Sequence, residues 1–162
     1  METQNPIVLA AGEGEKLATA GVEITFKARK SQTNGWWSCL EYAGPPPFQG
    51  PPPHYHKQME EVFYILEGSL TFFLEGQTYV CDAGSFVNIP PNHVHTFSNP
   101  NDTPARFLLW FSPGGFESYF EEAGHLIQTE GYPPKDIGKF IQLMEKYDTF
   151  SPNQSSNKNS NA

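Results

Sequence analysis

Residues 53–68 read PHYHKQMEEVFYILEG, and they bring two histidines and a glutamate together in a short stretch of chain. Side chains on a β-strand alternate between its two faces, so His54 and His56 are expected to point the same way, with Tyr55 opposed. Glu61 opens the apolar run that follows. The stretch therefore predicts a strand that aims both imidazoles, and after a short loop a carboxylate, at one place.

A second stretch adds two more histidines. Residues 84–99 read GSFVNIPPNHVHTFSN and contain His93 and His95, so four of the five histidines of the chain lie in these two stretches. Imidazole and carboxylate groups gathered in this way are typical of a metal site. Histidines two residues apart also occur on protein surfaces, and the spacing alone leaves that alternative open.

Both stretches resemble the two motifs of the cupin family. The first motif ends in His-x-His, three or four residues, Glu, six residues and Gly, and its matches here are His54, His56, Glu61 and Gly68. The second motif is Gly, five residues, Pro-x-Gly, two residues, His, three residues and Asn, and its matches are Gly84, Pro90, His95 and Asn99. The resemblance extends over roughly residues 22–111.

Two positions depart from the family pattern. Phe48 stands where the first motif opens with glycine, and Asn92 stands where the second motif has glycine after its proline. Neither position is a ligand in the family. Asparagine adopts left-handed backbone more readily than other non-glycine residues, so the turn at Asn92 is expected to survive.

The resemblance implies an all-β fold, a cupin-type double-stranded β-helix (jelly-roll barrel) with short C-terminal helices. It implies one divalent transition metal per chain, Mn, Fe, Co, Ni, Cu or Zn, held by His54, His56, Glu61 and His95. Within the family, three features look like bacterial quercetin 2,3-dioxygenase-type proteins: the short single-domain form, the four residues between His56 and Glu61, and residues 111–120, FSPGGFESYF. That likeness implies ring-opening dioxygenation of a flavonol or similar enol, with Glu61 as the catalytic base.

Composition agrees with one turn-rich β domain. The chain has 162 residues, of which 17% are charged and 14% aromatic, with fifteen prolines, and this balance suits a β protein better than a helical bundle. The formal net charge of -8 would repel phosphate backbones, so nucleic acid is not expected as a partner. A small-molecule substrate or ligand is expected instead.

The N-terminal sequence lacks the basic start and long apolar run of a secretory signal. No apolar run approaches the ~20 residues that a membrane-spanning helix needs. The chain is therefore expected to be soluble and cytoplasmic, with no membrane partner. Cys39 and Cys81 have no CxxC spacing and are predicted to be buried free thiols.

Four segments are expected along the chain. Residues 1–17 form an N-terminal arm or a short edge strand, and residues 18–112 form the cupin β-barrel. Residues 113–150 form a C-terminal helical segment, with helices at 116–123, ending at Gly124, and at 136–147. Residues 151–162 are rich in serine and asparagine and are predicted to be a disordered tail.

Two-residue turns predict how the central strands pair. A Glu67-Gly68 turn would pair residues 61–66 with 69–74, and a Glu75-Gly76 turn would pair Phe72 with Tyr79. Glu61, Tyr79 and Cys81 would then share an inner face. The opposite face carries apolar side chains that need a cover, either the C-terminal helices or a second copy, and we expect a homodimer. These side chains are Val62, Tyr64, Leu66, Phe73 and Val80.

Aromatic residues near the predicted ligands are candidates for the wall of a substrate pocket. Each is a core residue first and a substrate contact second. His93 falls outside the motif register, so it is expected near the pocket mouth, and His125 is expected to cap a helix end or face solvent. The predicted pocket residues are Phe63, Phe72, Tyr79, His93 and Phe97.

Three functions fit such a site. A dioxygenase of enol substrates is favoured by the resemblance. A non-catalytic metal or small-molecule binding module would keep the same ligands without turnover, and a cupin isomerase or lyase would use the metal as a Lewis acid without oxygen. No residue pattern distinguishes the last two.

Overall fold

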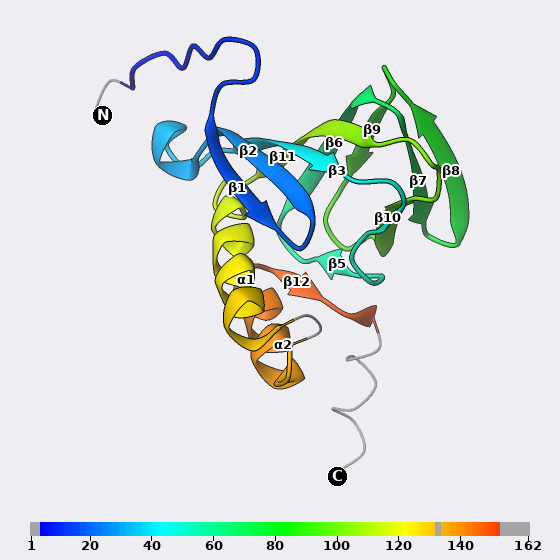
Figure 1. Cartoon of the computed structure of the whole chain (residues 1–162). Coiled ribbons are helices and arrows are strands. Elements are labelled where there is room, and N and C mark those ends of the chain that lie inside the picture. The colour runs from blue at the N-terminus through cyan, green and yellow to red at the C-terminus, as the bar shows by residue number, and fades with distance from the viewer. Residues whose placement is uncertain (1–3, 132–133, 153–162) are drawn as a thin grey trace.

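The computed structural model of the protein describes residues 4–131 and 134–152. Strands form most of it, and two helices lie near the C-terminal end (Figure 1), so the predicted all-β class with short C-terminal helices is confirmed. The elements in chain order are β1 (Glu15–Thr19), β2 (Val22–Ala28), the 3-10 helix η1 (Lys30–Gln32), β3 (Ser38–Gly44), β4 (Phe48–Gln49), β5 (Tyr55–His56), β6 (Glu60–Glu67), β7 (Ser69–Leu74), β8 (Gln77–Asp82), β9 (Phe86–Ile89), β10 (His95–Asn99), β11 (Ala105–Ser112), α1 (Glu117–Glu130), α2 (Ile137–Lys146) and β12 (Thr149–Phe150).

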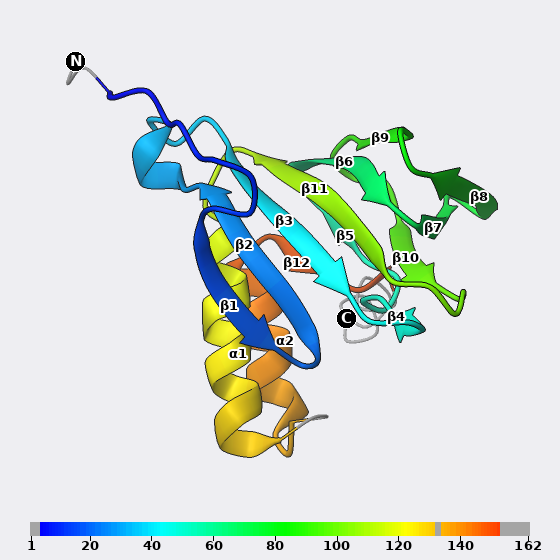
Figure 2. The same ribbon diagram turned by 45° about the horizontal axis from the view of Figure 1, so that its top comes forward.

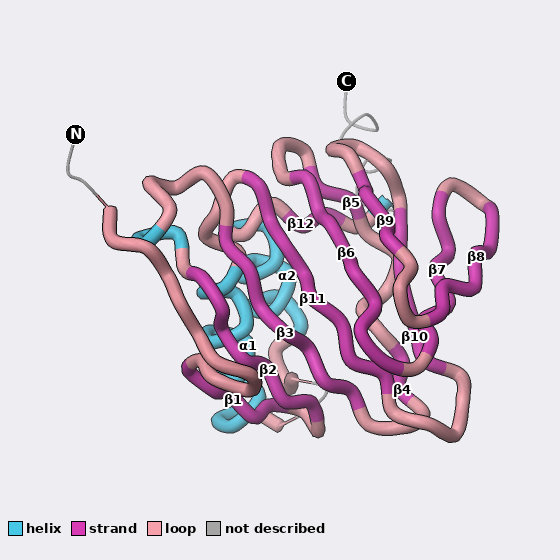
Figure 3. The backbone as a smooth tube through the Cα atoms, turned by 90° about the horizontal axis from the view of Figure 1, so that it is seen from above, coloured by secondary structure: helices cyan, strands magenta, loops and turns pink. Residues whose placement is uncertain are grey.

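The main strands form two antiparallel sheets. One sheet has the order β1-β2-β3-β11-β6-β9, and the other has the order β4-β10-β7-β8, while β12 and β5 form a separate short pair. Figure 3 shows the strands of the larger sheet side by side, with β7 and β8 turned away from its far end. Neighbours such as β3 and β11 are far apart in sequence, which is typical of a jelly roll.

Apolar side chains from both sheets meet in a core. The rings of Phe63 and Phe72 lie 5.0 Å apart in a T-shaped arrangement, and Phe97 lies 5.3 Å from Phe63. Such pairs add about 0.5–1.5 kcal/mol each beyond the area that they bury. On β6 the buried residues are Glu61, Phe63 and Ile65. The acid therefore shares an otherwise apolar face, as the alternation in the sequence predicts.

The predicted hairpin between β6 and β7 is wrong. Strand β6 pairs with β11 and β9, whereas β7 pairs with β10 and β8. Gly68, with φ of +73°, turns the chain out of one sheet and into the other, and the amide of Ala83 donates to its carbonyl. A two-residue turn is a local signal, and here the pairing of distant strands overrides it.

The second predicted hairpin is confirmed. Strands β7 and β8 pair with Leu74 opposite Gln77 and Phe72 opposite Tyr79, and Glu75 and Gly76 have φ of 47° and 83°. The expectation that Tyr79 is an inner residue is wrong, because its side chain is 46% exposed. Strand β8 is the last strand of its sheet, so no further strand covers Tyr79.

The N-terminal strands β1, β2 and β3 form one edge of the larger sheet. Strands β2 and β3 are antiparallel, with Asn34 and Gly35 at positive φ in the turn before β3. Strand β1 pairs with β2 at the edge of the larger sheet, which is the edge-strand alternative for the arm. In the proline-rich stretch, residues 44–53, strand β4 is short and pairs with β10.

The first helix is longer than predicted. Helix α1 continues through Gly124 and ends at Gly131, which has φ of +86° and whose amide donates to the carbonyl of Ile127. A Cβ atom on Gly124 would lie 3.2 Å from Oγ1 of Thr19, so this glycine lets α1 lie close to β1. Helix α2 agrees with its prediction, and Asp136 caps it by accepting from the amide of Lys139.

Helix α1 packs against β1 and β3, and α2 packs against α1 and β12 (Figure 2). They leave the predicted apolar outer face open, since Tyr64, Phe73 and Val80 remain 39%, 41% and 69% exposed. The suggestion that these helices cover that face is therefore wrong. Neither helix in the described chain has the length and apolar character that a bilayer span needs.

Both cysteines are free, as predicted. Cys39 is buried, and burial raises the pKa of its thiol to about 12. Cys81 is only partly buried, in contrast to its prediction. Of the predicted terminal segments, residues 1–3 and 153–162 lie outside the described residues, and the boundaries between the four segments stay predictions.

We predict that Gly68→Ala destabilises the protein more than Gly76→Ala. Both glycines have positive φ, so alanine at either position costs about 1–2 kcal/mol in left-handed backbone. A Cβ atom at Gly68 would also lie 2.3 Å from the carbonyl oxygen of Pro104, whereas nothing lies within 4 Å at Gly76. The clash adds roughly 1–3 kcal/mol. Urea unfolding measures the difference, and equal losses would show that the Gly68 turn is not tightly packed.

Candidate metal centre

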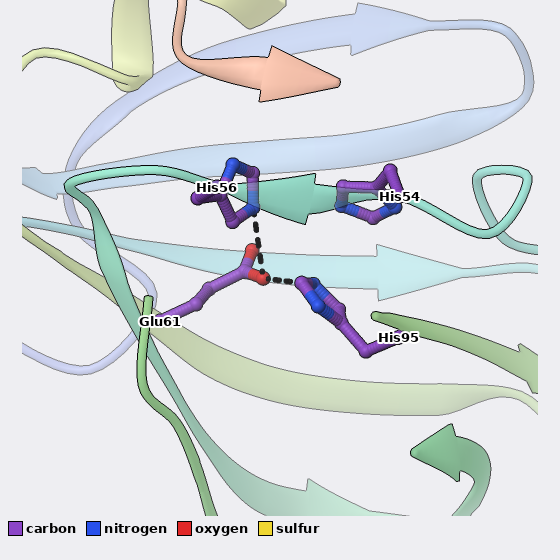
Figure 4. A group of neighbouring side chains, drawn as sticks. All are labelled: His54, His56, Glu61 and His95. Atoms are coloured by element: carbon purple, nitrogen blue, oxygen red, sulfur yellow. Dashed lines mark hydrogen bonds and ion pairs between the residues drawn. The ribbon is translucent and has the colours of Figure 1, made fainter. Parts of the chain in front are cut away.

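Four side chains converge at one end of the barrel (Figure 4). His54 directly precedes β5 and His56 ends it, Glu61 comes from β6, and His95 opens β10. The backbones of His54 and His95 exchange two hydrogen bonds of 3.0 and 2.9 Å. This pairing holds the segment with His54 and His56 beside His95. The two sequence motifs therefore meet through main-chain pairing.

The four residues form a compact and buried group. One ligand atom from each lies within 4.8 Å of all the others. The exposed fractions are 4% for His54, 2% for His56, 4% for Glu61 and 0% for His95. The residues that the motifs nominate as ligands are thus brought together.

Backbone carbonyls orient all three imidazoles. The Nδ1–H groups donate to the carbonyls of Pro52, Asp148 and His93, at 3.0, 2.9 and 2.9 Å in the order His54, His56 and His95. This arrangement leaves the Nε2 atoms for the centre of the group. Nε2 of His56 is buried and has no hydrogen-bond partner among the described residues.

The charges within the group oppose one another. Burial, helped by His95, lowers the pKa of His54 to about 4, so this imidazole is neutral at pH 7. Burial alone would raise the pKa of Glu61, but its contacts with the imidazoles of His56 and His95 outweigh it and hold that pKa below its usual range. Burial alone would lower the pKa of His95, and the contact with Glu61 raises it instead.

The donor set fits a divalent transition metal. Nε2 of His95 lies 2.9 Å from Oε2 of Glu61, and Nε2 of His56 lies 3.6 Å from the same oxygen. The shorter contact requires a proton between the two groups, and a cation would take the place of that proton. Three imidazoles and a carboxylate suit first-row ions from Mn to Zn. One of these three imidazoles, that of His56, has a buried Nε2 without a hydrogen-bond partner among the described residues, so this atom is free to bind an ion.

The other two histidines lie outside the group. The His93 side chain is exposed, and its Nδ1 lies 3.1 Å from the carbonyl of Pro91. His125 is exposed on α1, within the helix rather than beyond its end. Neither residue appears in the group that could hold a metal among the described residues.

A cavity of about 350 Å³ reaches the group through His54 and Glu61. Of the predicted pocket residues, Phe97 lines it. Phe63 and Phe72 are fully buried in the core, and Tyr79 and His93 lie elsewhere on the surface. The cavity is lined by barrel residues and by both helices, including Tyr42, Phe48, Leu109, Phe116, Tyr119, Phe120, Ile127, Phe140 and Met144.

The helical wall of the cavity was missed from the sequence. Phe140 and Met144 are four residues apart on α2, and Phe116, Tyr119 and Phe120 follow the same kind of spacing at the start of α1. This spacing predicts an apolar helix face, and such a face ordinarily packs on a protein core. The pattern does not reveal that the helices stand away from the barrel mouth and enclose a space.

Comparison with known proteins identifies the family. The model of the cupin domain matches residues 44–111, a range that contains all four residues of the group. The chain belongs to the cupin superfamily. In this cupin Asn92 has φ of +67°, and its amide donates to the carbonyl of His56. The asparagine therefore keeps the left-handed turn of the second motif.

Relatives of this cupin differ in size. The chain is 30% identical over 130 residues to a quercetin 2,3-dioxygenase from Bacillus subtilis, an alignment that covers 79% of this chain and 37% of that protein. It is 38% identical over 60 residues to the polyketide synthase CurC of Streptomyces cyaneus, covering 37% of this chain and 39% of that protein. The cupin thus spans less than half the length of these curated relatives.

Solved structures share the fold. The structure of KdgF from a Halomonas species superposes with a TM-score of 0.60 at 15% identity, and it covers 71% of this chain and 99% of that chain. An RmlC-like cupin from Shewanella frigidimarina gives a TM-score of 0.59 at 18% identity, covering 71% and 97%. At these identities the likeness concerns the jelly-roll fold alone.

We predict that replacing His54 and His56 with Ala abolishes metal binding, because two of the donors are lost. His93→Ala and His125→Ala serve as matched controls, and both should keep the metal since neither side chain lies in the group. Elemental analysis of the purified proteins measures the content. Stoichiometric metal in the double variant would contradict the ligand assignment.

Proposed function

We propose that this cupin binds one divalent transition metal and is a dioxygenase that acts on a flavonol-like or other enol small molecule. The observation that carries the proposal is the apolar cavity that ends on His54 and Glu61. Its volume of about 350 Å³ falls within the range of ~300–1,000 Å³ typical of small-molecule sites. The alignment with a quercetin 2,3-dioxygenase over 79% of the chain supports the reaction class.

The lining of the cavity favours an uncharged aromatic substrate. Among the described residues that line it, there is no lysine, arginine or aspartate, and Glu61 is the one carboxylate. Apart from the proposed metal ion, a phosphate or carboxylate group on a substrate would find no cation in this lining, and the side chains would not compensate for its desolvation. Aromatic rings of the wall, such as Phe116 and Phe120, can instead stack on a flat ring. An isomerase of anionic sugars is therefore less well supported.

Glu61 is placed to accept a proton from the substrate. Its carboxylate is buried, faces the cavity and stays ionised at pH 7 because the histidine contacts hold its pKa low. A divalent ion bound to the group would act as a Lewis acid and make an enol hydroxyl easier to deprotonate. Glu61 would then take the hydroxyl proton, and the apolar walls would exclude water from the resulting electron-rich enolate.

We predict that Glu61→Gln keeps much of the metal but loses oxygen uptake by about a hundredfold or more, the usual scale for a general base. Glutamine keeps the shape and an oxygen donor and removes the basicity. Glu60→Gln is the matched control, because Glu60 precedes Glu61 on β6 and its Oε1 accepts from Asn88 at 2.9 Å. An oxygen electrode with flavonols and simple enols measures the rates.

The outcomes separate the functions. A parent protein that binds the enol without consuming oxygen would be a binding module. If the parent consumes oxygen and Glu61→Gln consumes it equally fast, the protein is a dioxygenase but Glu61 is not its base. Loss of activity in Glu60→Gln to the same extent would mean that the effect of charge removal is not specific to Glu61.

The homodimer stays part of the proposal. Tyr64 on β6 pairs with Phe86 on β9, and their side chains are 39% and 65% exposed on the outer face of the larger sheet. Neighbouring aromatic residues at a sheet edge favour association. Light scattering should therefore give twice the 18.1 kDa of one chain, and Phe86→Glu should shift the mass toward one chain. A parent mass of 18.1 kDa would refute the dimer.

A further inference from the structure

The C-terminal end of the described chain lies directly against β5, the strand that carries the candidate ligand His56 and directly follows His54. Strand β12 pairs with β5, with Thr149 opposite His56 and Phe150 opposite Tyr55 (Figure 1). We refer to residues 148–150 as the C-terminal clasp. The matched family model ends at residue 111, so the clasp lies outside the matched barrel.

Asp148 contacts the ligand segment with both its side chain and its main chain. Its carboxylate accepts hydrogen bonds from the amides of Lys57, Gln58 and Met59, at 3.2, 2.8 and 2.9 Å. Its carbonyl accepts the Nδ1–H of His56 at 2.9 Å. The residue has φ of +56°, a left-handed conformation in which aspartate is one of the better tolerated residues.

These contacts constrain the path between two ligands. Residues 57–59 connect His56 to the start of β6, where Glu61 lies. The partner of all three amides of this connection is the carboxylate of Asp148, which lies far along the chain. Three donors that meet one carboxylate hold this loop in one shape. The carbonyl of Asp148 at the same time accepts from Nδ1 of His56, which leaves Nε2 on the inner side of the ring, 3.6 Å from Oε2 of Glu61.

Other residues of the clasp add to the same attachment. Oγ1 of Thr149 lies 3.4 Å from Nδ1 of His56, and Thr149 is buried. The ring of Phe150 lies 5.7 Å from that of Tyr55, and Nζ of Lys57 lies 3.6 Å above the Phe150 ring. Phe150 thus contacts the side chains of Tyr55 and Lys57, which flank His56 in the sequence.

We propose that Asp148 is a positioning residue of the metal centre, and that closure of the C-terminal clasp and metal binding stabilise each other. The inference rests on the proposed metal site and is independent of the proposed reaction. In the closed form of the clasp β12 is paired with β5, and in the open form it is detached. If a metal ion binds the closed form more tightly than the open form, metal binding must raise the ratio of closed to open forms by the same factor. Loss of the Asp148 carboxylate should therefore weaken metal binding, although Asp148 contacts Nδ1 of His56 and not the Nε2 atom that would bind the metal.

The test compares Asp148→Gly, Asp148→Asn and Asp136→Gly with the parent full-length chain. Glycine removes the carboxylate and keeps the positive φ accessible, and asparagine keeps one acceptor oxygen. Asp136→Gly is the matched control, because Asp136 also accepts from a backbone amide in the C-terminal segment but contacts none of the ligand residues in the described structure. Competition with a chromogenic chelator gives the affinity for Co²⁺.

We expect Asp148→Gly to bind Co²⁺ about 10–100-fold more weakly, the usual effect of removing a residue that orients a ligand. Asp148→Asn should fall between the parent and Asp148→Gly, and Asp136→Gly should match the parent. Equal affinity of the parent and Asp148→Gly would overturn the inference. Equal weakening in Asp136→Gly would also overturn it, because the cause would then be general destabilisation of the segment.

Hydrogen exchange of the parent supplies a test that needs no variant to fold. Saturation with Co²⁺ should slow exchange at the amides of Thr149 and Phe150 more than at Ala123 in α1. An equal response at all three amides would overturn the coupling. If the parent binds no Co²⁺ or other divalent transition ion, the proposed metal site fails and this inference fails with it, whereas binding without coupling refutes the inference alone.

Discussion

A carboxylate placed among apolar side chains costs several kcal/mol unless other groups compensate for its lost hydration. Glu61 stands in this position, on the same face of β6 as Phe63 and Ile65. Its compensation comes from His56 and His95, which belong to two other strands. The chain must therefore bring β5, β6 and β10 to one end of the barrel, and the geometry of the site follows from that requirement.

The ligand group could be predicted from the sequence because the resemblance to the two cupin motifs nominates its four residues, and each motif is a local signal. The spacing of His54 and His56 uses the two-residue period of a strand, and the second motif supplies His95 in a turn whose φ at Asn92 agrees with the sequence. The β7–β8 hairpin was predictable for the same reason, since the Glu75-Gly76 turn lies between its two strands.

The failures concern contacts between distant segments. A turn at Gly68 looks the same whether the chain returns in one sheet or crosses to another. The pairing of β6 with β11 and of β7 with β10 decides between the two, and no local pattern in the sequence shows it. Gly124 reads as a helix end, but it serves a close approach of α1 to Thr19. The pocket wall was missed because an apolar helix face has the same pattern whether it meets a core or a cavity.

The division of the cavity between two parts of the chain has an evolutionary consequence. The candidate ligands come from the barrel, whereas Phe140, Met144 and the residues of α1 come from the helices. Substitutions on the helices can therefore change the shape of the cavity while the candidate ligand group is preserved. Related proteins can thus differ in the molecules that fit the cavity and keep the same four side chains. The freedom ends near Lys146, the last residue of α2, because Asp148 follows so closely that an insertion there would displace it from His56.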